Sequence, residues 1–234
     1  MDRQHRHLAF RRLAGDLDGV DLAVYREHGA DPLEPIIGEG DARARLAVFG
    51  RDPGREEVRY RRPFIGAGGQ KVRGVVYEVV HGRAMPDFEA SVKVGDYLFW
   101  ANTVPYKPIG NKAWSTTVKK RFQPLMADVL LTEWHGSDVV TLGREAFLWF
   151  GLAQDREVRQ SLDDHWRRED RFEASLTIDY CGPGKNGRPF RLHPLPHPSP
   201  LNATWYRRFP DLLRARLRSL GLTPETWQIP SGKG

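Results

Sequence analysis

Short apolar runs alternate along this 234-residue chain with stretches whose apolar positions recur at helical spacing. The short runs are rich in β-branched and aromatic residues and are nearly continuous, which is typical of strands buried on both faces of a parallel sheet. They predict strands at residues 46–49, 97–101, 138–142, 175–179 and, as a fifth candidate, 190–193. We therefore expect a central, mainly parallel sheet of four to five strands.

Helical spacing is clearest in four stretches, residues 68–81, 116–134, 144–150 and 204–220. A further helix is expected near residues 8–17. In the last of the four stretches Leu213 and Leu217 share one face, which predicts an amphipathic helix, and Pro210 is expected to delay its regular part until Asp211. Because strands and helices alternate, the fold class is α/β, a three-layer α/β/α sandwich with helices on both faces of the sheet.

The length favours one domain over two. With 40% hydrophobic and 11% aromatic residues, the chain can bury a substantial core. We expect a single domain over residues 1–234, with a core at about 40–222 and a frayed tail at 230–234.

The charge balance is basic, with a net charge of +6. Arginines cluster at residues 59–62, 167–168 and 207–208. Such a balance favours a polyanionic partner such as DNA, although each cluster is equally compatible with an ordinary solvated surface.

A single cysteine, Cys181, can form neither an internal disulfide nor a thiolate cluster. No apolar stretch approaches the roughly 20 residues needed to cross a bilayer, and the charged start leads into no signal-like apolar segment. We therefore expect a cytoplasmic protein without metal, cofactor or membrane association.

Candidate chemistry lies directly after the predicted strands. Gly50-Arg51-Asp52-Pro53-Gly54 follows the first strand, Asn102 the second, Gly143 the third and His197 the last. In parallel sheets ligands bind beyond the carboxyl ends of the strands, so these residues are expected at one edge.

Two of these residues have side chains that can be charged or can donate a proton. Asp52 lies in a Gly/Pro turn, where its carboxylate could stabilise a positive sugar or orient a water, or simply cap the turn. His197 lies in a proline-rich segment that excludes a helical metal pair with His193. Its imidazole could donate to an oxygen that gains negative charge, or could have only a structural role.

Two further residues could recognise a base. The amide of Asn102 has one acceptor and two donors, enough to read a pyrimidine edge. Phe64 follows Pro63 and precedes small residues, so its ring could stack on an extruded base. A satisfied turn asparagine and an ordinary core phenylalanine are the alternatives.

Together these segments resemble the uracil-DNA glycosylase superfamily. His197-Pro198-Ser199-Pro200-Leu201 is identical to the second motif of its family 1, and Gly50-Arg51-Asp52-Pro53 departs from the first motif only at Arg51 before the tyrosine position. The spacing to Pro63-Phe64-Ile65-Gly66 is similar to that of family 4. The resemblance spans residues 46–220.

The resemblance implies a role for each matched residue. Asp52 would stabilise the sugar cation and position water, and His197 would stabilise the uracil anion at O2. Phe64 would stack on the flipped uracil, and Asn102 would read its N3 and O4 edge.

The resemblance also implies that further residues contact DNA. Ser199 would contact a flanking phosphate, and Leu201 would be the wedge that enters the duplex. We also expect Arg207 and Arg208 to contact DNA.

Three departures from the family motifs matter. Arg51 stands where the families have glutamine or glutamate, and Gly54 stands where family 1 has the tyrosine that excludes thymine; we expect both at the substrate. Tyr106 stands where family 4 has one of four cluster cysteines, so we predict no iron–sulfur cluster.

The leading hypothesis is a monomeric, monofunctional uracil-DNA glycosylase of base excision repair, which flips uracil and hydrolyses its N-glycosidic bond. One alternative is a damage-sensing DNA-binding protein with little catalysis, since fold alone does not guarantee chemistry. Another is a glycosylase for hypoxanthine or xanthine.

Overall fold

The computed structural model describes residues 2–182, 184, 187–199, 203–223 and 225–227. Within these residues, six strands form one sheet in the order β1-β3-β2-β4-β6-β5. The strands are β1 (Glu39–Gly40), β2 (Leu46–Gly50), β3 (Phe99–Asn102), β4 (Asp138–Leu142), β5 (Leu176–Tyr180) and β6 (Arg188–Leu195). The four inner strands are parallel, and the edge strands β1 and β5 pair antiparallel.

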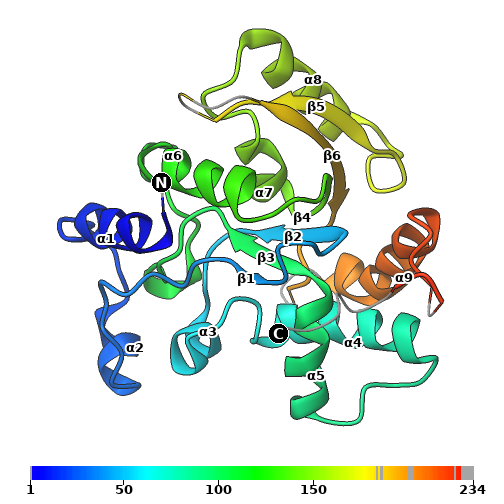
Figure 1. Cartoon of the computed structure of the whole chain (residues 1–234), viewed down its shortest axis with the longest axis horizontal. Coiled ribbons are helices and arrows are strands. Elements are labelled where there is room, and N and C mark those ends of the chain that lie inside the picture. The colour runs from blue at the N-terminus through cyan, green and yellow to red at the C-terminus, as the bar shows by residue number, and fades with distance from the viewer. Residues whose placement is uncertain (1, 183, 185–186, 200–202, 224, 228–234) are drawn as a thin grey trace.

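The helices of the described chain cover both faces of the sheet (Figure 1). They are α1 (Arg3–Ala14), α2 (Leu22–Glu27), α3 (Arg55–Tyr60), α4 (Ala67–His81), α5 (Phe88–Val94), α6 (Thr116–Thr132), α7 (Arg144–Trp149), α8 (Arg156–Arg167) and α9 (Ala203–Ser219), with short 3-10 turns at Gly95–Tyr97 and Ile109–Asn111. The predicted three-layer α/β/α class is confirmed.

Alternation along each inner strand divides the core in two. In β2, Ala47 and Phe49 face a core built with α1, α6 and α7, whereas Leu46 and Val48 face one built with α4, α5 and α9. Because both faces are covered, all five β2 residues are buried. Burial on both faces explains why β2 is a continuous apolar run in the sequence.

Several element predictions were incomplete. The sheet has a sixth strand, β1, and helices α2, α3, α5 and α8 were not predicted. The first helix begins at Arg3, where the Asp2 side chain accepts a hydrogen bond from the backbone N–H of His5 and so caps it.

The expectation for Pro210 was wrong, because α9 runs through it. A proline leaves the carbonyl four residues earlier without its helical donor. Here that carbonyl belongs to Tyr206, and the Lys71 ammonium donates to it at 2.9 Å. A contact from α4 therefore satisfies the group that Pro210 leaves open. The tail at 230–234 lies outside the described residues.

Candidate active site

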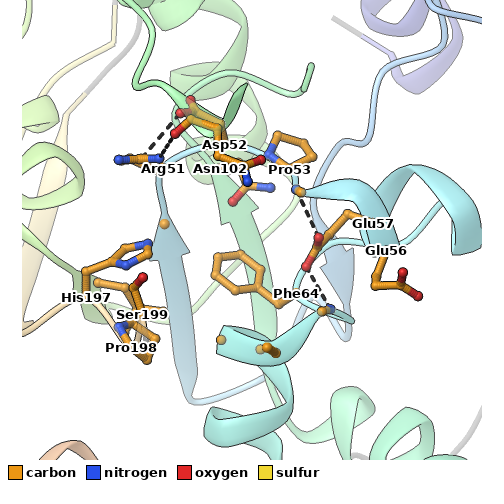
Figure 2. A pocket seen from close by; sticks show the side chains of 18 of the residues that line it. Arg51, Asp52, Pro53, Glu56, Glu57, Phe64, Asn102, His197, Pro198 and Ser199 are labelled. Atoms are coloured by element: carbon orange, nitrogen blue, oxygen red, sulfur yellow. Dashed lines mark hydrogen bonds and ion pairs between the residues drawn. The ribbon is translucent and has the colours of Figure 1, made fainter. Parts of the chain in front are cut away.

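A cavity of about 390 Å³ lies at the carboxyl edge of the sheet. Each inner strand supplies part of its wall: Gly50 ends β2, Asn102 ends β3, Leu142 ends β4, and His197 follows β6. Gly50 pairs with Asn102 in the register of β2 and β3, so the segments that follow these two strands begin side by side. The structure thus brings predicted residues of the segments after β2, β3 and β6 to one place (Figure 2), whereas at β4 the wall contains Leu142 and not the predicted Gly143.

Asp52 has the most perturbed carboxyl group of the cavity. Its side chain is only 2% exposed, and Oδ1 lies 3.2 Å from the Thr103 hydroxyl. Oδ2 lies 3.5 Å from Arg51 Nε and accepts no well-formed hydrogen bond from the described part of the chain. Burial raises the pKa of Asp52 to about 6, although the charges of Arg51 and Lys119 oppose the shift. The carboxylate is therefore mostly ionised at neutral pH, but burial of its charge lowers the stability of the folded protein.

Arg51 lies between the Asp52 carboxylate and the His197 imidazole (Figure 2). Its guanidinium donates to the Asn111 carbonyl at 2.8 Å, so the segment after β3 holds it in place. Lys119, the second cation that acts on Asp52, is buried and forms an ion pair with Glu145. Among the described residues Lys119 is not part of the cavity wall.

His197 is shifted in the opposite direction. Burial, and then the charge of Arg51, lowers the pKa of His197 to about 4, so its imidazole is neutral at pH 7. Gly143 lets the histidine segment approach: its φ is +87°, and a Cβ there would lie 3.0 Å from His197 Cβ. The cavity therefore combines a neutral imidazole with an ionised carboxylate.

Phe64 presents its ring from a left-handed backbone conformation, with φ of 54°. A Cβ on Gly50 would lie 2.5 Å from the ring, so glycine is required there for the ring to lie against β2. The ring centre is 5.1 Å from that of Trp100. Non-glycine residues adopt this backbone region only when their surroundings hold them there.

Arg73 on α4 provides that support and was not predicted. Its guanidinium is buried and donates to the carbonyls of Phe64 at 2.9 Å, Pro63 at 3.3 Å and Ser91 at 2.7 Å. It also lies 4.5 Å from the ring centre of Trp100. Burial lowers the pKa of Arg73 to about 10, so it stays charged at neutral pH.

Glu57 is the second residue that the sequence analysis missed. Its carboxylate accepts from the backbone N–H of Gly54 at 2.9 Å and from that of Gly66 at 2.8 Å. Gly54 is the N-cap of α3 and Glu57 its third residue. Glutamate at that position is the acidic half of a capping box, which is a signal the sequence did contain.

The remaining predicted residues lie at different distances from the cavity. Asn102 is 3% exposed, and Asn102 and Ser199 both line the wall. Arg207 and Arg208 are exposed on α9 and do not belong to the wall, and Arg208 lies 5.0 Å from the ring centre of Trp205. Leu201 lies outside the described residues.

Residues that could bind a metal are not gathered here. Within the described ranges, no three His, Cys, Asp or Glu side chains are grouped as a metal site would need. Tyr106 is buried, and its hydroxyl donates to the Leu33 carbonyl at 3.1 Å. The helices described also include none that is long and apolar enough to span a membrane.

Fold and cavity together define a class of protein: an α/β domain whose sheet edge carries an aromatic ring, an amide, a neutral imidazole and a buried carboxylate. The family model of the uracil DNA glycosylase superfamily matches residues 37–221. The chain therefore belongs to this superfamily, which confirms the resemblance seen in the motifs and makes DNA glycosylase, a hydrolase of DNA repair, its class of activity. No curated protein matches the chain.

Proposed function

We propose that the protein removes uracil from DNA by hydrolysing its N-glycosidic bond. The observation that carries the proposal is the convergence of Phe64, Asn102, His197 and Asp52 on one cavity. Uracil would be flipped out of the DNA into this cavity and stack on Phe64. Asn102 would bind its N3 and O4 edge, and His197 would donate to O2.

The charge states support a dissociative reaction. As the C1′–N1 bond breaks, its electron pair goes to the base, and the neutral His197 donates a hydrogen bond to the O2 of the resulting anion. The ionised Asp52 stabilises the cationic sugar and orients a water that adds to C1′. The proton of this water passes to Asp52 and on to the base, leaving free uracil and an abasic site.

DNA would be held outside the cavity. Ser199 at the wall would contact a flanking phosphate, Arg207 and Arg208 would add charge on α9, and Arg51 and Gly54 would border the base. Leu201, outside the described residues, is proposed as the wedge because of its motif. The enzyme would act as a monomer, without an iron–sulfur cluster and without an amine nucleophile, since none of the described residues that line the cavity is a lysine.

The test is release of uracil from an oligonucleotide that carries a single uracil. We expect release by the native chain and a loss of about 100-fold or more in His197→Ala. Cavity volume alone does not select a pyrimidine, so hypoxanthine and xanthine belong in the panel. Binding of uracil-DNA without release of any base would contradict the proposal and indicate a damage sensor.

A further inference from the structure

Glu57 joins two walls of the cavity through its carboxylate. Oε2 accepts from Gly54 in the loop after β2, and Oε1 accepts from Gly66 at the N-terminus of α4. The residue is only 9% exposed, and it lines the cavity together with both glycines. Its orientation is therefore fixed from two sides.

The carboxylate fills the space that side chains at the two glycines would need. A Cβ on Gly54 would lie 2.7 Å from Oε2, and a Cβ on Gly66 would lie 3.0 Å from both oxygens. This part of the wall is consequently a carboxylate and not an apolar surface. Each of its oxygens can accept two hydrogen bonds, and one backbone N–H on each oxygen leaves capacity for a ligand.

The position of Glu57 opposite His197 determines which part of a bound uracil it would contact. In Figure 2 the ring of Phe64 lies between His197 on one side and Glu57 on the other. C2 and C5 lie across the ring from each other in a pyrimidine. A uracil stacked on Phe64 with O2 at His197 therefore turns C5 toward Glu57.

We propose that Glu57 determines which groups a pyrimidine may carry at C5, an inference that rests on the proposed function. A methyl group would cover the carboxylate without donating a hydrogen bond, which is unfavourable for a buried charge. A hydroxymethyl group is larger but donates one. The pocket therefore ranks hydrogen above hydroxymethyl and hydroxymethyl above methyl, whereas a purely steric wall would rank methyl above hydroxymethyl.

The experiment compares uracil, 5-hydroxymethyluracil and thymine, each opposite guanine in the same duplex, under single-turnover conditions. For the native chain we expect hydroxymethyluracil to be released at least about tenfold faster than thymine. In Glu57→Ala, hydroxymethyluracil release falls and thymine release rises, so that the ratio approaches one. Glu78→Gln, on α4 and outside this cavity, removes the same charge and should keep the native ratio.

Glu57→Gln covers the case in which the alanine variant does not fold. It keeps the volume, but its amide nitrogen faces one of the two N–H donors, so it should lower the hydroxymethyl-to-methyl ratio at nearly unchanged cavity size. A native chain that releases uracil but prefers thymine to hydroxymethyluracil, or a ratio that is unchanged in the Glu57 variants, overturns the inference alone. A folded native chain that releases no uracil overturns the proposed function instead.

Discussion

Replacing Asp52 with asparagine should make the protein more stable while it removes activity. The pKa of about 6 in the folded protein exceeds the value of 3.8 that an unperturbed aspartate has. The folded state therefore binds the proton more tightly than the unfolded state, and native stability falls as pH rises from about 4 through about 6. An asparagine side chain is neutral at every pH and avoids this loss.

The magnitude follows from the two pKa values. The difference between a pKa of 3.8 and one of about 6 corresponds to about 3 kcal/mol above pH 7, where the carboxyl is ionised in both states. At pH 4 the same relation leaves less than about 1 kcal/mol. Asp52→Asn should therefore gain at most about 3 kcal/mol at pH 8, or about 6–12 °C in Tm for a chain of this length.

Urea unfolding at pH 4 and pH 8, followed by two spectroscopic probes to check two-state behaviour, measures the effect. The informative quantity is the difference in stabilisation between the two pH values, roughly 2–3 kcal/mol, because any change in hydrogen bonding by the amide cancels. Asp18→Asn, an exposed carboxylate, is the matched control and should show no such difference. Equal stabilisation by Asp52→Asn at both pH values would refute the idea that the charge of Asp52 lowers the stability of the folded protein.

The remaining predictions concern the reaction and the loop that carries the aromatic ring. The rate of uracil release should rise with pH through about 6, as Asp52 ionises, with no loss above pH 7 because His197 is already neutral; a flat profile from pH 5 to 8 would contradict this. Arg51→Gln should shift this rise to higher pH, since the arginine charge lowers the pKa of Asp52, and an unmoved rise would count against that coupling. Arg73→Lys removes donors to three backbone carbonyls, so the free energy of unfolding in urea should fall by about 2 kcal/mol, and KM should rise because Phe64 is held less firmly. Unchanged stability and KM would show that the three contacts are dispensable.

The parts of the fold that the sequence revealed are those with long periodic patterns. The buried inner strands are continuous apolar runs, and α4, α6 and α9 each span 15 or more residues. Strand β1 has only two residues, and it pairs with β3 because Gly40, at φ of +116°, has no Cβ to collide with the Leu98 carbonyl. A glycine in isolation carries no such signal.

The site divides in the same way. Residues after the strands were found because the carboxyl edge of a parallel sheet brings them together whatever their side chains. Arg73 and Glu57 were missed because charged residues are expected at the surface unless a partner buries them. Their partners are backbone groups, which side-chain patterns do not locate, and only the glutamate at the third position of α3 left a capping signal in the sequence. The supporting residues of a site are thus harder to predict than those that would touch the substrate.

Arg51 gives a physical meaning to one departure from the family motifs. A positive charge favours the ionised form of a neighbouring carboxyl and the neutral form of a neighbouring imidazole, so one guanidinium acts on both groups in the useful direction. Burial alone would favour the neutral form of both. Arg51 therefore offsets part of the cost of ionising Asp52 and adds to the burial that keeps His197 neutral. The residue that departs from the motif is the one that couples the charge states of the two proposed catalytic groups.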